Sequence, residues 1–211
     1  TEAVPLGMLL NVVNSSSAAL TYARKKLIVW PVAIPFAVTM IAFAPLGVWL
    51  NVQLPVKPLL VLFALFTAAA AVLMLSGWRP KRGDLSPKGR VALGLTAGSG
   101  LGTFAGMIGR GGGSFVVPLL YIAGLEARNA AATSAIIVTC SGTSSFISHL
   151  ATAARPQWGI WIATVVAVLL GSQLGSRLMA GRMKSRAVKQ VFAVVLLGVA
   201  ALIIVKDVIL A

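Results

Sequence analysis

Charged residues are scarce in this sequence, and acidic ones are very scarce. They make up 10% of its 211 residues, whereas a soluble domain carries about 25%. The acidic side chains are Glu2, Asp84, Glu126 and Asp207, which all fall in loops or near the ends of apolar segments. A proton relay of buried carboxylates is therefore not expected in this chain.

Cysteine and histidine occur once each, as Cys140 and His149. A single cysteine excludes an internal disulfide. One histidine, one cysteine and scattered acids cannot supply the three or four ligands of a metal site. We also find no nucleophile with a neighbouring base, and the glycine run at residues 111–113 lacks the Lys-Ser/Thr ending of a phosphate-binding loop. We expect no enzyme, no metal and no cofactor.

Apolar residues are abundant: they form 58% of the chain, and the mean hydropathy is +0.95. They occur in long blocks, which predicts an all-α polytopic membrane protein. The net charge of +14 comes from basic residues in short loops between these blocks. That distribution is the positive-inside pattern of a lipid-embedded protein, and it argues against a nucleic-acid partner.

Eight apolar segments are predicted. The fifth is too short to cross about 30 Å of hydrocarbon, so it predicts a re-entrant or bent hairpin of two half-helices with the fourth. The most basic connections follow the first, third and seventh segments, and cytoplasmic placement of all three gives a consistent topology with both chain ends outside. The segments are residues 3–23, 27–50, 56–77, 91–108, 114–125, 130–150, 158–178 and 188–210.

A glycine-rich stretch joins the fourth and fifth segments. Four glycines at every fourth position, from Gly94 to Gly106, share one helical face and predict close approach of another backbone. The pattern then breaks at residues 109–114 (GRGGGS). Non-helical backbone at membrane depth is tolerated where it lines a cavity, and its free N–H groups suit an anion.

The two halves of the chain resemble each other when displaced by 127 to 129 residues. Because the charge argument gives the matched segments opposite directions, this predicts an inverted-topology repeat, the usual plan of a secondary transporter. We expect one transmembrane domain over residues 1–211, with a partial first repeat (1–77), a basic loop (78–90) and a second repeat (91–211). The counterpart of residues 91–128 is expected ahead of Thr1. The matches include residues 14–17 with 141–144, Trp30 with Trp158, and Gly47 with Gly175.

An ordered set of motifs resembles the sulfite exporter TauE/SafE family of anion transporters. The set is Gly106-x-x-Gly109-x-Gly111-Gly112-Gly113, then Pro118, Ala130 to Ser134, His149, Trp158, and Gly171-x-x-x-Gly175. The resemblance implies an all-helical permease for sulfite, sulfonates or related anions in the inner membrane of a prokaryote. Its substrate is a small anion, its surroundings are the lipid bilayer, and a homodimer or other membrane subunits are further candidate partners.

Two groups of residues are the candidate site. The anion-binding group comprises the glycine-rich break at residues 109–114 and two hydroxyl-bearing residues of the sixth segment. The pathway group comprises polar residues of the first and sixth segments. Competing interpretations are helix packing for the glycines, an arginine that reaches the surface for Arg110, and interhelical hydrogen bonds for the hydroxyls. The two groups are Gly109, Arg110, Gly111, Gly112, Gly113, Ser114, Thr133 and Ser134, and Asn11, Asn14, Ser15, Ser141 and Ser145.

Two functions remain in competition at this point. The first is an alternating-access permease for a small sulfur-containing anion. The second is a non-transporting membrane subunit that descends from such a transporter and packs against other chains in a larger complex.

Overall fold

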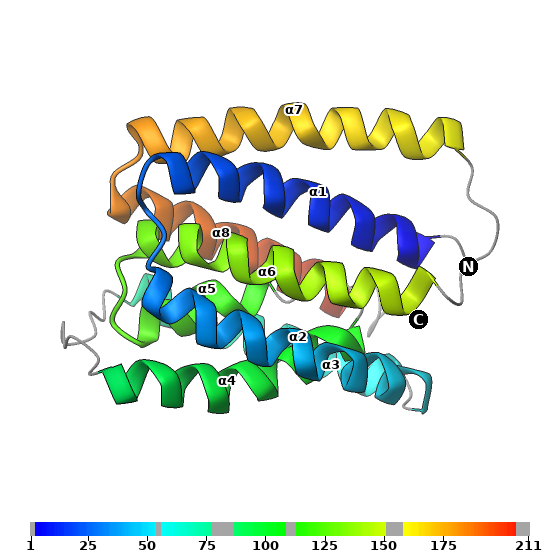
Figure 1. Ribbon diagram of the computed structural model, residues 1–211. Helices are drawn as coiled ribbons and strands as arrows, with labels where there is room; N and C mark the ends of the chain where they lie inside the picture. The colour runs from blue at the N-terminus through cyan, green and yellow to red at the C-terminus, as the bar shows by residue number, and fades with distance from the viewer. Residues whose placement is uncertain (1–2, 54–55, 77–86, 109–112, 151–157, 206–211) are drawn as a thin grey trace.

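A computed structural model describes residues 3–53, 56–76, 87–108, 113–150 and 158–205 (Figure 1). These residues form an all-α structure without strands, as predicted. The helices are α1 (Ala3–Arg24), α2 (Trp30–Gln53), α3 (Val56–Leu75), α4 (Pro87–Ile108), α5 (Gly113–Ile122), α6 (Ala127–Leu150), α7 (Trp158–Arg182) and α8 (Ser185–Ile203).

Each predicted segment corresponds to one helix, but several helix ends differ from the prediction. Residues 177–189 were expected to form a loop, yet α7 continues to Arg182 and α8 begins at Ser185. Likewise α4 begins at Pro87, inside the predicted basic loop, where proline suits a first helical turn. The predicted segments end where the sequence stops being apolar. The helices themselves continue beyond that point, because helical hydrogen bonds also form between polar residues.

Four of the described helices have the length and composition of membrane spans. Among the described residues, α2, α6, α7 and α8 contain segments that are long and apolar enough to cross a bilayer. Large apolar side chains also lie on the outside, such as Leu174, which is 73% exposed. Outward apolar side chains are expected where lipid replaces water, so the chain is a multi-pass membrane protein.

The glycine face of α4 packs against α2, which runs parallel to it (Figure 1). A Cβ atom added at Gly94 would lie 2.9 Å from Pro35 Cβ, and one at Gly102 would lie 2.9 Å from Met40 Cα. The Thr39 hydroxyl donates to the Gly94 carbonyl across this contact, at 2.7 Å. The predicted close backbone approach is confirmed, and α2 is its partner.

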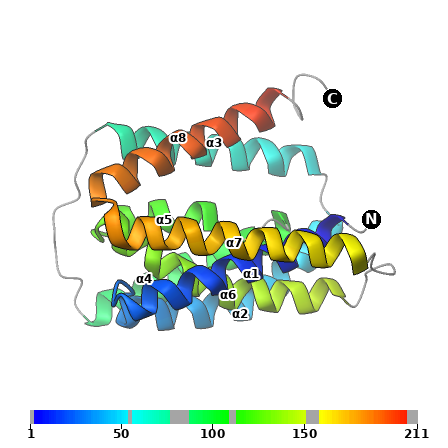
Figure 2. The ribbon, with the colours of Figure 1, turned by 90° about the horizontal axis from the view of Figure 1, so that it is seen from above.

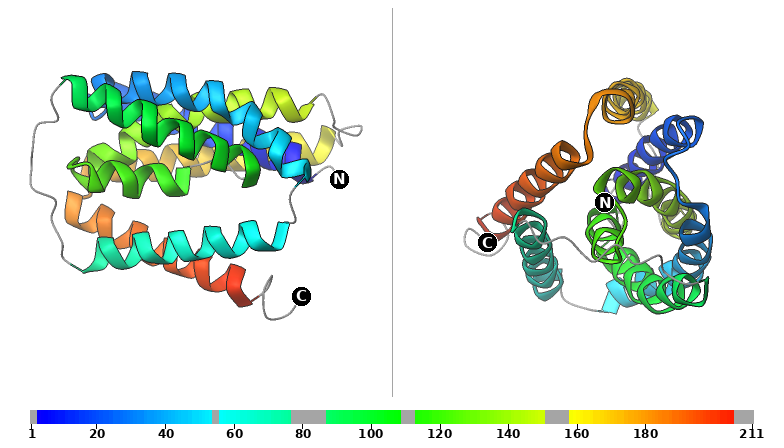
Figure 3. Two further views of the ribbon diagram at one scale, coloured as in Figure 1. Left: turned by 90° about the horizontal axis from the view of Figure 1, so that it is seen from below. Right: turned by 90° about the vertical axis from the view of Figure 1, so that its left-hand side faces the viewer.

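Contacts between the other helices have the two-fold pattern that the repeat predicts. The matched helices α1 and α6 pack on each other, and so do the matched helices α3 and α8. The contact of α1 with α7 matches the contact of α6 with α2. Figure 2 and Figure 3 show the α3–α8 pair beside the group formed by the other helices. In the described residues, α7 has no partner equivalent to α4.

Replacing Gly98 with alanine tests the α4–α2 contact. The new methyl group would collide with the Thr39 hydroxyl, and overpacking of this kind costs about 1–3 kcal/mol. We expect the free energy of unfolding, measured in detergent by tryptophan fluorescence, to fall by that amount. Gly100→Ala is the matched control, because nothing lies within 4 Å of its added Cβ. Equal destabilisation by both changes would contradict the packing role.

Candidate functional site

The candidate anion site lies where α4 ends and α5 begins. Gly109, Arg110, Gly111 and Gly112 are outside the described residues, and Gly113 and Ser114 form the first turn of α5. The two helices beside the break differ in length. With 22 residues α4 is long enough for a full span, and only α5, with ten residues, is short.

The start of α5 is enclosed by protein. Its first described side chain, Phe115, is 1% exposed. The Phe115 ring makes edge-to-face contacts with Phe66 of α3, at a centroid distance of 5.0 Å, and with Phe104 of α4, at 5.3 Å. A ten-residue helix spans about 15 Å, so α5 begins about half-way along the bundle (Figure 3). The first N–H groups of a helix have no partner within the helix itself, and this helix begins beside the buried Phe115.

Thr133 and Ser134 lie on α6, which packs against α5. Thr133 is fully buried, and its hydroxyl accepts a hydrogen bond from the Val29 backbone N–H at the start of α2, at 3.0 Å. Ser134 is also buried, and its hydroxyl donates to the Ala131 carbonyl at 2.9 Å. Thr133 thus joins two helices, whereas Ser134 bonds only within its own helix.

Polar residues of α1 and α6 meet where these helices pack. A Cβ atom added at Gly142 would lie 3.2 Å from Val12 Cγ2 and 3.4 Å from Asn11 Nδ2, so the Asn11 carboxamide lies in this interface. Asn11 Nδ2 is buried and has no hydrogen-bond partner. Ser15 of α1 and Ser141 of α6 are buried and donate to carbonyls of their own helices.

The remaining pathway candidates are divided between two environments. Ser145 is buried on α6. Asn14 is exposed, and its backbone carbonyl accepts a hydrogen bond from the Ser172 hydroxyl of α7, at 2.8 Å. The structure therefore groups Asn11 and Ser15 with the α6 hydroxyls, while Asn14 lies toward α7.

Sequence analysis did not single out Gln173, which joins α7 to α1. Its Nε2 donates to the Ser17 hydroxyl at 2.7 Å and to the Ser17 carbonyl at 3.1 Å, and its Oε1 accepts from the Thr21 hydroxyl at 3.4 Å. The signal was available in the sequence, since a glutamine inside an apolar segment needs a polar partner.

Two cationic side chains make contacts between helices at the end of the bundle where α6 and α8 begin. Arg128 donates to the Ala180 carbonyl near the end of α7, where a cation also complements the helix dipole. Lys189 Nζ lies 3.3 Å from the Tyr121 hydroxyl and 5.4 Å from the centre of its ring. These contacts connect α5 and α6 to α7 and α8 at one end.

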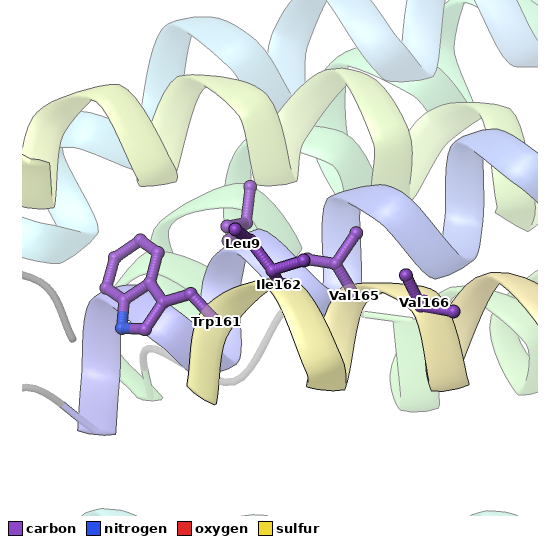
Figure 4. A pocket seen from close by; sticks show the side chains of 5 residues that line it. All are labelled: Leu9, Trp161, Ile162, Val165 and Val166. Atoms are coloured by element: carbon purple, nitrogen blue, oxygen red, sulfur yellow. The ribbon is translucent and has the colours of Figure 1, made fainter. Parts of the chain in front are cut away.

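A hollow between α1 and α7 has a different character. It measures about 180 Å³ and is lined by Leu9, Trp161, Ile162, Val165 and Val166 (Figure 4). Its apolar lining suits hydrocarbon, so the interior start of α5 is the better candidate for an anion.

Comparison with known proteins agrees with the resemblance found in the sequence. A family model described as sulfite exporter TauE/SafE matches residues 1–203. No curated protein and no solved structure matches the chain significantly.

Replacing Thr133 separates its structural role from ligand binding. Thr133→Val leaves the Val29 N–H without a partner in a buried position, which costs about 1–3 kcal/mol. We expect the unfolding midpoint in detergent to fall for Thr133→Val and to stay near the parent value for Thr133→Ser, which keeps the hydroxyl. A similar loss with serine would assign the effect to the methyl group instead.

Proposed function

This chain belongs to the sulfite exporter TauE/SafE family, and from that premise we propose that it is a permease for a small sulfur-containing anion such as sulfite or an organosulfonate. It works by alternating access in the inner membrane of a prokaryote. The basic connections of the bundle, including residues 24–26 and 183–184, face the cytoplasm, in keeping with the positive-inside rule.

One observation carries the proposal: α5 begins inside the bundle rather than at its surface. The N–H groups of its first turn, from Gly113 onward, are hydrogen-bond donors at the positive end of a helix dipole. Half-helix N-termini of this kind bind anionic substrate groups in other transporters. The preceding residues, with Gly109, Gly111 and Gly112, add backbone donors, and Arg110 adds a charge suited to a sulfite or sulfonate group.

The pathway runs along the packed faces of α1 and α6. Asn11 contributes a buried amide donor that no protein group uses, and Ser15, Ser141 and Ser145 contribute buried hydroxyls. A donor that makes no hydrogen bond to another helix can donate to an oxyanion instead, and no contact between helices is lost. Their location between the two repeat units fits a mechanism in which one unit moves against the other.

Arg110 is tested against a second arginine of the chain. Purified protein is titrated with sulfite, sulfate, thiosulfate, sulfoacetate and taurine, and the tightest ligand is used for variants. We expect Arg110→Ala to weaken binding by about tenfold to a hundredfold, as for the loss of a charged hydrogen bond. Arg155→Ala is expected to have little effect. If both changes weakened anion binding equally, Arg110 would have no specific role in the site.

Asn11→Leu offers a test with two opposite readouts. Replacing an unsatisfied buried amide with an apolar side chain of similar size removes a desolvation cost. We expect an unfolding midpoint equal to or above that of the parent, together with anion binding that is weaker by about tenfold. Unchanged binding would remove Asn11 from the pathway.

A membrane subunit that packs against other helices is the second candidate, and one feature of α7 favours it. Gly171 and Gly175 have no atom within 4 Å of an added Cβ, whereas Gly47, the counterpart of Gly175 in the repeat, packs against α4. Small residues in this spacing suit helix–helix contact. Anion flux through proteoliposomes that contain only the purified protein would favour the permease, and absence of flux would favour the subunit.

A further inference from the structure

Two parallel helices, α1 and α7, bring their basic ends together. The Thr21 hydroxyl donates to Gln173 Oε1, at 3.4 Å. Four residues later on each helix come Lys25 and Arg177, so these two cations lie at about the same height. Figure 1 shows the ends of α1 and α7 on the same side of the bundle. The cluster consists of basic residues in the last turns of the two helices and just after them, all of them exposed: Arg24, Lys25, Lys26, Arg177, Arg182 and Lys184.

Residues 3–53 and 158–205, which include both helices, contain neither aspartate nor glutamate. Among the described residues the one acidic side chain is Glu126, which precedes α6. In the repeat, the equivalent helices are α6 and α2, and their corresponding ends carry no lysine or arginine at residues 148–150 or 50–53. Of these two equivalent helix pairs, only α1 and α7 end in a cluster of cations.

The backbone at Lys26 gives a second, independent observation. Lys26 has φ 54°, and it ends α1 with the N–H bonds of a Schellman motif, from Lys26 to Ala23 and from Leu27 to Tyr22. The same motif ends α5, where Gly124 occupies the position with φ 98°. Glycine is preferred there because it has no Cβ. Lys26 therefore holds a cation at a backbone position that favours glycine.

An apolar track leads from the cluster along the outer face of α7, where Leu170 and Leu174 are 63% and 73% exposed. Leu20 and Leu9 are 11 residues apart on α1, and so are Arg177 and Val166 on α7, so each pair shares one helical face after three turns. Leu20 is 62% exposed. The track ends in the hollow of Figure 4, which Leu9 and Val166 help to line. Eleven residues span about 16 Å, close to half the thickness of the hydrocarbon core.

From these observations we infer that α1 and α7 form a binding site for an acidic phospholipid. The phosphate binds the cations at the helix ends, and an acyl chain follows the track to the hollow near the middle of the bilayer. Charge complementarity selects an anionic headgroup, and the apolar track selects a lipid over a soluble phosphate. The site is separate from the proposed anion pathway between α1 and α6, and it does not depend on that proposal.

Thermal unfolding of the detergent-purified protein tests this site. Dioleoylphosphatidylglycerol should raise the unfolding midpoint in a saturable way, whereas dioleoylphosphatidylcholine and glycerol phosphate should not. An equal rise with phosphatidylcholine would overturn headgroup selection. A rise with glycerol phosphate alone would overturn the lipid track.

Variants then assign the site to its residues. Lys25→Gln and Arg177→Gln should each weaken the apparent affinity for phosphatidylglycerol about fivefold, the usual effect of one cation near a membrane surface. Lys88→Gln, which removes an exposed cation at the start of α4, is the matched control and should change nothing.

Lys26→Gly provides the decisive variant, because it cannot act through loss of folding. Glycine suits the backbone at φ 54°, so the midpoint without lipid should equal or exceed that of the parent. The lipid affinity should still fall about fivefold. An unchanged lipid affinity in Lys26→Gly, or a loss in Lys88→Gln of the same size as in Arg177→Gln, would overturn the site.

Discussion

The absence of water in the bilayer core is the constraint on which this structure depends. Every backbone N–H and C=O group at membrane depth needs a partner from the protein, which leaves helices as the way for this chain to cross. A helix as short as α5 breaks that rule at its first turn unless protein surrounds it. The burial of Phe115 between α3 and α4 supplies such surroundings. The first turn of α5 therefore begins inside the molecule, and the proposed anion site is placed there for that reason.

Close contact between α4 and α2 supports this arrangement. The glycine face of α4 allows the backbones to approach so closely that Thr39 can donate to the Gly94 carbonyl. The end of α4 is thereby fixed against Gly47 of α2. Because the chain enters α5 only four residues after α4 ends, a rigid α4 also limits where the first turn of α5 can lie. Packing of small residues and the location of the candidate site are thus connected.

Periodic features were predictable from the sequence, and individual partners were not. Regular spacing from Gly94 to Gly106 predicted close approach on one face, but no sequence pattern identified α2 as the partner. Hydropathy located the apolar segments but missed the extension of α7 to Arg182, because helix and lipid contact end at different residues. Thr133 was predicted as an anion ligand, yet its hydroxyl also accepts from Val29, a contact between residues 104 positions apart. Such long-range bonds follow from the packing angle of two helices, which local sequence does not encode.

Polar side chains in this bundle fall into two classes that differ in what they can do. The side chains of one class form hydrogen bonds to another helix or to the residue that precedes it, and breaking these bonds would weaken the contact between helices. Its members are Thr39, Thr133 and Gln173. Ser15, Ser134 and Ser141 instead donate to carbonyls three or four residues earlier in their own helices. A carbonyl in a helix keeps its backbone hydrogen bond when such a hydroxyl rotates away. The second class can therefore change its hydrogen bonds without separating helices, whereas the first class keeps the helices in place. In the proposed permease, that division is what allows the polar faces of α1 and α6 to bind an anion within a stable helical framework.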